Sequence, residues 1–368
     1  MLPHIINKIH LMEHRYFNKA VKCALIIFLM QLGIHGIDAQ EKTPRNYIAY
    51  KASEALVIDG KNDELAWEKA PWSQDYIDIE GVKTPTYRTR MKMLWDKDYL
   101  YVLAEMEEPH VWATLKQRDT VIFYNNDFEI FIDPDGDTHN YYEYEMNAHN
   151  TLWDLFLTKP YRNHGKVIDS WDIQGVKSAV HIDGTLNNSS DLDKGWTVEI
   201  ALPWKVITEA SSGGGVPENQ FWRINFSRVN WDFDLNEGRY SRKKDEKGKF
   251  MPEYNWVWSP QGVINMHEPE HWGYVYFSSE EAGGSTNFSI PKDDYIKWHM
   301  YSLYRGILHG REGAVGQVSQ PKVILGQDVK AAYEQSSFGW TISVKSPFTG
   351  KTLVITEDGK FKSLDVKK

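Results

Sequence analysis

The 368-residue sequence predicts an all-β protein: an antiparallel, jelly-roll-like β-sandwich with a small C-terminal α+β appendage. Short segments of alternating apolar and polar residues recur between about residues 47 and 279, turn-forming residues separate them, and helical periods are few. The chain is long enough to bury a large core. Its 15 tryptophans and 20 tyrosines supply rings either for that core or for stacking against a ligand.

A targeting segment precedes the predicted strands. Basic residues come before an apolar run from Cys23 to Ile34, which is too short for a comfortable transmembrane helix and typical of a signal peptide. Met12 would give a more typical start than Met1. Cleavage after Ala39 would remove residues 1–39, including the single cysteine, and leave no transmembrane span in the mature chain. We therefore expect an exported protein that is periplasmic, at the cell surface or extracellular.

The predicted strands follow in order. Residues 91–107 hold two apolar runs divided by the turn sequence WDKD, and residues 127–137 end an alternating strand in a Pro/Asp/Gly turn. Further strands are predicted in residues 195–204, 221–231 and 271–278. Between them, residues 141–147 alternate strictly: Tyr142, Tyr144 and Met146 share one face, and Glu143, Glu145 and Asn147 share the other.

A linker is predicted at residues 278–287, which are rich in serine, glycine and acidic residues. After it, a helix should begin at Pro291 and end before Gly310. Short strands follow, with a hairpin turn at Asp358-Gly359. The predicted organisation is a signal peptide at residues 1–39, a β-sandwich at 46–280 and the α+β appendage, of unknown role, at 288–368.

The charge balance limits the kinds of partner. Lys plus Arg number 42 and Asp plus Glu number 51, so the net charge of −9 argues against binding to nucleic acid. The charged segment 236–255 is interpreted as a solvated loop. Asp133, Asp135 and Asp137 form an oxygen-rich turn that could hold a structural calcium ion, although a solvated turn is the alternative, because the spaced glutamate of an EF-hand is missing.

The segment NMHEPEHWG, residues 265–273, contains the H-E-x-x-H pattern of many zinc peptidases. Zinc binding through this pattern requires a helix that turns His267 and His271 toward one metal ion. Pro269 lies inside the pattern and disfavours a continuing helix, and an apolar strand follows almost at once. We expect a loop tied down by hydrogen bonds, with no zinc site.

Five segments resemble, in the same order, the family 9 carbohydrate-binding module, and together they cover most of residues 47–279. The resemblance implies a non-catalytic β-sandwich in which aromatic rings stack on a sugar and polar side chains bond its hydroxyls. The matching segments are VIDGKNDELAW (57–67), LWDKDYLYVLAEMEEP (94–109), NDFEIFIDPDGD (126–137), GWTVEIALPWKVI (195–207) and WSPQGVINMHEPEHWGYVYF (258–277).

The resemblance also implies positions for a sugar site. The two family tryptophans, which sandwich one sugar unit, fall on Phe123, with Tyr124 beside it, and on Met266. The family acidic residue, arginine and two asparagines fall on Glu129, Glu145, Asn147 and Val263. The reversed charge at Glu145 and the lost ring at Met266 predict that the specificity differs, or that the site has moved to Trp153 or Trp231.

Three functions follow as hypotheses. The first is an exported protein that binds an oligo- or polysaccharide, needs no cofactor and serves polysaccharide degradation or uptake beside glycosidases or glycan importers. The second is a hydrolase of O-glycosyl bonds, for which Glu129, Glu143 and Glu145 are available but no pair is distinguished by its spacing. The third is an assembly module that has lost sugar binding.

Overall fold

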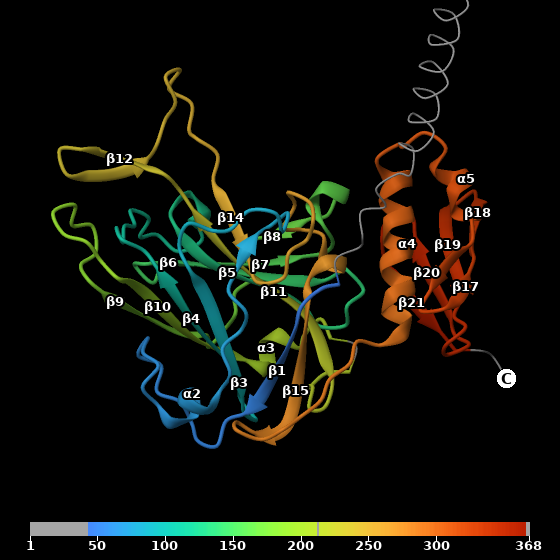
Figure 1. The fold of residues 1–368 in the computed structure, drawn as a ribbon, viewed down its shortest axis with the longest axis horizontal. Helices are drawn as coiled ribbons and strands as arrows, with labels where there is room; N and C mark the ends of the chain where they lie inside the picture. Colours follow the sequence, from blue (N-terminus) through green and yellow to red (C-terminus); the bar gives the residue numbers. More distant parts are fainter. Residues whose placement is uncertain (1–42, 212, 366–368) are drawn as a thin grey trace, which may run out of the picture. The chain divides into compact units, whose positions relative to one another are not determined.

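One continuous sheet of 13 strands folds over a shared core to make a two-layered sandwich in the computed structural model, which describes residues 43–211 and 213–365 (Figure 1). The predicted signal peptide lies outside the described residues. The first layer contains β8 (Val167–Ile168), β7 (Leu152–Leu157), β6 (Tyr141–Asn147), β5 (Asp127–Asp133) and β11 (Phe221–Asn230), in that spatial order. The second contains β3 (Thr89–Trp95), β4 (Tyr99–Glu107), β10 (Gly195–Pro203) and β9 (Lys177–Asp183).

Two strands join the layers. Strand β15 (Gly273–Glu281) pairs with β11, and β1 (Asn46–Lys51) lies between β15 and β3. Strand β1 runs parallel to both neighbours, whereas the other named pairs of this sheet are antiparallel. A short strand, β14 (Tyr254–Val257), pairs with the end of β11 and with β2 (Ile77–Asp78). The all-β sandwich prediction is confirmed.

The alternation in β6 decides which side chains reach the outer face. Tyr142, Tyr144 and Met146 are buried in the core between the layers, together with apolar residues of β3, β4 and β10. Because successive side chains of a strand point to opposite faces, Glu143 and Glu145 project from the outer face of the first layer. The predicted alternation of inward and outward side chains in residues 141–147 is therefore confirmed.

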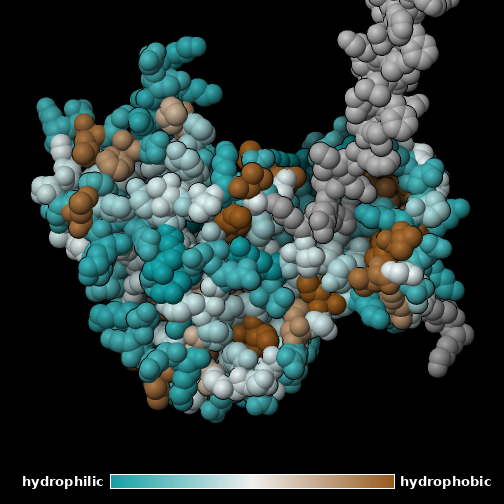
Figure 2. Space-filling model, in the orientation of Figure 1, coloured by the Kyte–Doolittle hydropathy of each residue, from teal (hydrophilic) through white to brown (hydrophobic). Residues whose placement is uncertain are grey.

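The segment predicted as a charged loop is partly ordered as a hairpin. Strands β12 (Phe233–Asn236) and β13 (Arg239–Arg242) pair with each other, and Lys244 bridges Phe250. The side of the sandwich visible in Figure 2 is largely hydrophilic, with apolar residues scattered over it. No helix of the described ranges is long and apolar enough to cross a membrane.

The C-terminal residues form a helix packed on a four-stranded antiparallel sheet, with their own hydrophobic core. As predicted, the helix α4 (Lys292–Leu308) begins after Pro291 and ends before Gly310, and the chain turns at Asp358-Gly359. Strand β15 continues to Glu281, so part of the predicted linker is strand. The remaining elements are α5 (Ala314–Val318), β16 (Lys322–Ile324), β17 (Gln327–Val329), β18 (Ala331–Ser336), β19 (Gly339–Lys345), β20 (Thr352–Thr356) and β21 (Phe361–Leu364).

Helix α4 makes buried polar contacts with loops of the sandwich. The ammonium group of Lys297 donates a hydrogen bond to the carbonyl of Gly136. The Arg305 guanidinium contacts the Glu270 carboxylate, with 2.7 Å between Nε and Oε1. Glu270 belongs to η3 (Pro269–His271), a short 3₁₀ turn just before β15. The helix therefore holds the loop that contains NMHEPEHWG.

The first strand residue after that loop leaves no room for a side chain. A Cβ atom on Gly273 would overlap the indole ring of Trp258, which is buried in the sandwich core. We expect Gly273→Ala to lower the free energy of unfolding by about 1–3 kcal/mol, because overpacking displaces a rigid ring. Urea denaturation measures the change. Gly316→Ala is the control, since no atom lies within 4 Å of the added Cβ; an equal loss in both variants would contradict the steric argument.

Candidate functional site

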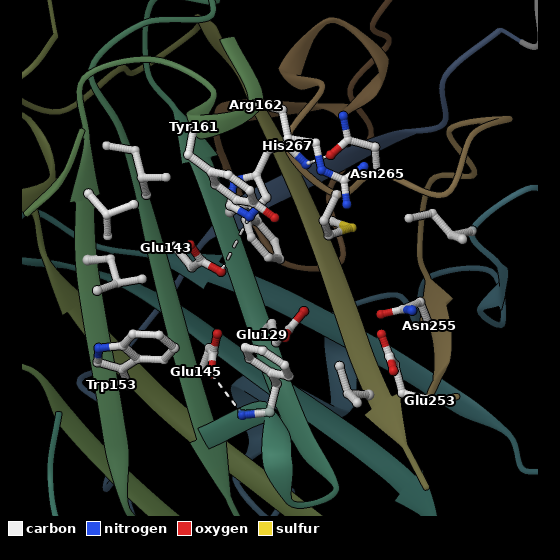
Figure 3. Close-up of a pocket in the computed structure, with 18 of the residues that line it drawn as sticks. Glu129, Glu143, Glu145, Trp153, Tyr161, Arg162, Glu253, Asn255, Asn265 and His267 are labelled. Carbon is white, nitrogen blue, oxygen red and sulfur yellow. Dashed lines mark hydrogen bonds and ion pairs between the residues drawn. The ribbon is translucent and has the colours of Figure 1, made fainter. Parts of the chain in front are cut away.

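A cavity of about 280 Å³ opens on the outer face of the first layer (Figure 3). Strands β5, β6 and β7 form its floor and one wall. The segment η1 (Ile122–Tyr124), the neighbourhood of β14 and the loop before η3 complete it. The side chains used below that line the cavity are Phe123, Glu129, Phe131, Glu143, Glu145, Trp153, Leu155, Leu157, Tyr161, Arg162, Glu253, Asn255, Asn265, Met266 and His267.

The floor carries three glutamates, all projecting from the outward face of two paired strands. In the register of β5 and β6, Glu129 is directly opposite Glu145, and Glu143 is opposite Phe131. Their exposed fractions are only 4% for Glu129, 5% for Glu143 and 1% for Glu145. Figure 3 shows the three carboxylates pointing toward the same space. Like charges placed directly opposite each other in a sheet repel, so this arrangement is electrostatically costly.

Burial and this repulsion change the acidity of the floor. Burial raises the pKa of Glu129 to about 7, and the exposed Glu253 at the rim also raises it. Burial, followed by the neighbouring charge of Glu129, raises the pKa of Glu143 well above its usual value. The pKa of Glu145 is raised in the same way, by burial first and then by Glu129 and Glu143. The empty floor therefore retains protons at a pH at which ordinary glutamates are ionised.

Two basic side chains lie at the far end of the cavity. The Nδ1 atom of His267 lies 2.8 Å from the Tyr141 hydroxyl, and its Nε2 atom lies 3.9 Å from Glu143 Oε1. Burial, followed by the charge of Arg162, lowers the pKa of His267 to about 3, so the imidazole is neutral at neutral pH. Arg162 is exposed and donates to the carbonyl of Ile264 at 3.2 Å. Within the described residues, neither group forms a close ion pair with the floor.

Apolar side chains make the walls. Phe123, Trp153 and Met266 are half-buried and line the cavity, and Figure 3 shows the Trp153 ring beside Glu145. The backbone N–H of Phe123 donates to Glu145 at 3.0 Å, and its carbonyl accepts from the Trp231 indole at 2.8 Å. The carbonyl of Met266 accepts from the Trp272 indole at 2.9 Å. Both wall segments are thus fixed by hydrogen bonds that leave their side chains facing the cavity.

The structure brings together several of the predicted sugar-site residues: Phe123, Glu129, Glu145, Met266 and the alternative platform Trp153 line one cavity. Four others lie elsewhere. The Tyr124 ring is 44% exposed, but the Arg242 guanidinium lies over it at 4.2 Å. Trp231 is buried behind Phe123 and does not line the cavity, and Val263 is exposed outside it.

Asn147 is the fourth residue outside the cavity. Its side-chain N–H groups donate to the carbonyl of Leu115 and to Asn125, and its oxygen accepts from the backbone N–H groups of His149 and Thr151. The residue is completely buried. Its side chain is thus occupied in shaping the turn after β6, and the described structure leaves it no group for a ligand.

Several lining residues have no place in the sequence prediction of the sugar site. Glu143, which the sequence offers only as a hydrolase carboxylate, precedes Glu145 by two residues on an alternating strand, and that spacing is the signal that places it on the floor. Nothing in the sequence pattern identifies Tyr161, Arg162, Glu253 or Asn255. Tyr161 and Arg162 lie in a short 3₁₀ turn, η2 (Tyr161–Asn163), Glu253 lies in a loop and Asn255 in β14. Only the tertiary fold brings them to β5 and β6.

The H-E-x-x-H segment forms a hydrogen-bonded loop, as predicted. Its two histidines diverge, because His267 contacts Tyr141 whereas the Nε2 atom of His271 lies 3.4 Å from Glu268. Glu268 also accepts from Asn265 at 2.9 Å. Burial alone would raise the pKa of Glu268, but His271, Arg305 and Asn265 lower it to about 2. The pattern has no helix that could turn both histidines toward one metal ion.

The aspartate turn brings Asp133, Asp135 and Asp137 together, each with an oxygen within 4.8 Å of the others, and lysines lie beside it. Asp133 accepts backbone N–H groups from Gly136 and Thr138, both at 2.9 Å, and Lys360 pairs with Asp137 at 2.9 Å. The buried Lys297 ammonium lies against the Gly136 carbonyl. Calcium prefers a shell of six to eight oxygens, and two ammonium groups beside the turn do not suit it. The calcium site therefore stays a prediction, and the function proposed for the cavity does not depend on it.

One family model matches half of the chain. Residues 58–243 match the model of the family described as carbohydrate family 9 binding domain-like. The chain is 25% identical over 251 residues to exoglucanase XynX of Acetivibrio thermocellus, covering 66% of this chain and 18% of that protein. It is 27% identical over 162 residues to endo-1,4-beta-xylanase A of Thermoanaerobacterium saccharolyticum, covering 42% and 11%. The chain therefore spans less than a fifth of these relatives.

Among solved structures, the chain is similar to a family 9 carbohydrate binding module from Caldicellulosiruptor kristjanssonii in complex with cellotriose. The identity is 16% and the TM-score 0.40, covering 67% of this chain and all of that one. The same module in complex with glucose gives 17% identity and a TM-score of 0.39, covering 66% of this chain and all of that one.

Proposed function

The chain belongs to the carbohydrate family 9 binding domain-like family, and from that premise we propose that it binds an oligo- or polysaccharide by holding a sugar unit in the cavity above Glu129, Glu143 and Glu145. The binding is non-covalent. It joins ring stacking on the walls to hydrogen bonds from the sugar hydroxyls to the floor.

The observation that carries this proposal is the combination of flat apolar walls with a buried acidic floor. A pyranose ring has apolar C–H faces that can pack on Trp153 and Phe123, and hydroxyl groups that need acceptors when they leave water. Glu129 and Glu143 offer such acceptors inside the cavity. Asn255 and Asn265 add amide groups at its edge. A cavity of about 280 Å³ is at the lower end for small-molecule sites, which suits one sugar unit more than a long chain segment.

We further propose that the protein is exported and works beside glycosidases or glycan importers. Two observations support this: the basic and apolar N-terminal segment before Ala39, and the names of the two relatives given above, which are an exoglucanase and a xylanase. The chain itself has the role of a binding protein in this proposal. Glycan retention and product analysis distinguish this role from the hydrolase and assembly alternatives.

Replacing Trp153 by alanine tests the binding mode. We expect retention on a responsive glycan to fall about tenfold or more, because the variant loses a stacking face and its buried apolar area. Affinity electrophoresis or a glycan array measures the change. Trp72→Ala is the matched control: Trp72 is also half-buried, but it packs with the cluster around Trp67 rather than in the cavity.

Product analysis on the same samples separates the alternatives. New reducing ends that disappear in Glu129→Gln or Glu145→Gln would indicate a hydrolase of O-glycosyl bonds. Capture of a protein partner, without retention on any glycan, would indicate an assembly module. Equal loss of retention in Trp153→Ala and Trp72→Ala would contradict the proposed site.

A further inference from the structure

We propose that the sugar held in this cavity carries a positive charge, and that the preferred ligand is an amino sugar with a free, protonated amine. This inference rests on the proposed function and specifies its ligand class. It starts from the carboxylates of the cavity floor and from the counter-charge that they lack.

The first observation is how closely the carboxylates approach one another. Asp127, Glu129 and Glu145 each offer an oxygen, and these three atoms all lie within 4.8 Å of one another. All three side chains are at least 96% buried. Glu143, the neighbour of Glu145 on β6, lies on the same floor (Figure 3). Four acidic side chains are thus concentrated at one point of the sheet.

The second observation is that one acceptor atom of this group lacks a donor, and that, within the described residues, none of the group has a cationic partner at close range. The Oδ2 atom of Asp127 is buried and has no hydrogen-bond partner, although Oδ1 accepts from the backbone N–H of Val229. The Glu143 carboxylate points into the cavity, where its hydrogen-bond partner is the Glu145 side chain, another acid, and the Nε2 atom of the neutral His267 lies 3.9 Å away. Unfilled acceptors in a buried site indicate a missing donor.

The third observation is the contrast with other buried acids of the same chain. Glu108 contacts Arg228 at 2.5 Å, and Glu270 contacts Arg305 at 2.7 Å. Both partners come from the protein itself. Glu199, which is also fully buried, accepts instead from the Trp67 indole and from the backbone N–H groups of Asp59 and Gly60. Each of these three acids thus has a donor from the protein, and Glu108 and Glu270 have an arginine. The cavity floor receives none within the described residues, which leaves the counter-charge to a ligand.

The groups that face the floor do not replace this cation. Asp127 on β5 and Glu253 beside β14 add negative charge. His267, from the loop before η3, is neutral at neutral pH, and Arg162, from the turn after β7, is exposed and donates to a backbone carbonyl. The buried Arg228 of β11 acts on Asp127 and opposes the rise of its pKa, but its own ion-pair partner is Glu108. The floor therefore keeps a net negative charge when the glutamates are ionised.

An ammonium group suits this floor better than a metal ion does. A protonated amine has three N–H donors, which matches three acceptor oxygens that lie close together. Calcium would need six to eight oxygen ligands. The walls add a requirement that an isolated cation cannot meet, because Phe123 and Trp153 present apolar rings suited to the C–H face of a pyranose. An amine on a sugar ring satisfies both the walls and the floor.

The inference has a pH signature. Binding requires ionised glutamates and a protonated amine, so affinity should decrease at low pH, where the floor takes up protons, and again at high pH, where the amine loses its proton. Because the pKa of Glu129 is about 7, the acid-side decrease should begin near neutral pH. A neutral sugar would show no alkaline decrease from its own titration.

Calorimetry on the full-length protein tests the inference. Three matched trimers are compared: β-1,4-linked glucosamine, its N-acetylated form and cellotriose. The glucosamine trimer should bind about tenfold or more tightly than the other two, since charge-assisted hydrogen bonds are the stronger kind. Glu143→Gln and Glu145→Gln should remove this preference. Both changes keep the side-chain shape and relieve repulsion, so loss of folding does not explain the loss of binding. Glu54→Gln, at an exposed position, is the control.

Each other outcome has a defined meaning. Equal or tighter binding of cellotriose would overturn the inference and leave the proposed function standing, whereas binding of no glycan in a broad array would overturn both. Putrescine is the ammonium probe without a ring, and binding as tight as that of the glucosamine trimer would exclude a sugar-specific site. A requirement for added Ca²⁺, abolished by a chelator, would assign the floor to a metal ion and overturn the inference as well.

Discussion

Replacing Arg305 by alanine is expected to lower the free energy of unfolding by about 3–5 kcal/mol, the usual cost of leaving one member of a buried ion pair alone. Glu270, its partner at 2.7 Å, is only 1% exposed. Burial alone would lower the pKa of Arg305, but Glu270 and then Glu268 raise it above its usual value. The variant would therefore bury an uncompensated carboxylate between helix α4 and η3.

Urea denaturation measures this loss, and two further variants interpret it. Arg311→Ala removes an exposed arginine near the end of the same helix and should change stability little. The double variant Arg305→Met with Glu270→Met should recover much of the lost stability, because an apolar pair of similar volume avoids the cost of burying charge. If the double variant were less stable than Arg305→Ala, the lost stability would not come from the unpaired Glu270.

The same variant should also weaken ligand binding. Met266 and His267 line the cavity, and the loop that carries them continues into Glu268 and Glu270, the two acids that Arg305 contacts. A loop released from helix α4 would lose its defined position at the cavity wall. The role of the appendage would then be to hold this wall in place, although none of the described residues that line the cavity belongs to the appendage.

The second large effect is a pH-dependent gain of stability in Glu129→Gln. The folded protein binds a proton on Glu129 up to about pH 7, whereas the unfolded chain releases it near the ordinary value of 4.5. Stability contributed by the protonated carboxyl is therefore complete below about pH 4.5 and lost as the pH rises to about 7. The difference corresponds to roughly 3 kcal/mol at pH 7 and above, and glutamine, which does not titrate, avoids this loss.

The measurement is the difference in unfolding free energy between Glu129→Gln and the parent protein, taken from pH 4.5 to 8. A difference is needed because His267 acts in the opposite direction: its pKa is lowered to about 3, so its contribution to stability grows as the pH rises toward 6.5. Glu54→Gln should show no such trend. A gain for Glu129→Gln that is constant with pH would contradict the assignment of the titrating group.

Local patterns were sufficient to predict much of the fold. The two-residue period of β6 identified which side chains enter the core, and Asp358-Gly359 identified a hairpin, because both signals depend on neighbours along the chain. The parallel pairing of β1 could not be predicted in this way. Its partners β3 and β15 are distant in sequence, and a parallel neighbour leaves no turn signal between them.

The site was only partly predictable for a similar reason. Phe123, Glu129, Glu145 and Met266 were placed by resemblance, and the structure brings all four to one cavity. Asn147 shows the limit of placing residues by resemblance. Its side chain forms hydrogen bonds within the turn after β6 and is not available to a ligand. The depth at which the glutamates are buried depends on loops such as the one before η3, whose position is fixed by helix α4.

The position of β1 has a consequence for how the protein folds. Strand β1 begins at Asn46 and its parallel partner β15 begins at Gly273, so nearly the whole sandwich sequence separates two strands that lie side by side (Figure 1). During synthesis β1 cannot pair with β15 until β15 has been made. The entropy cost of closing so long a loop must also be met before the pairing contributes any stability. The sandwich should therefore close late and slowly, once the last strand has emerged. Until then the edge of β1 that faces β15 is unpaired, although β3 can already pair with its other edge. Other chains could join the unpaired edge, which a chaperone would have to prevent.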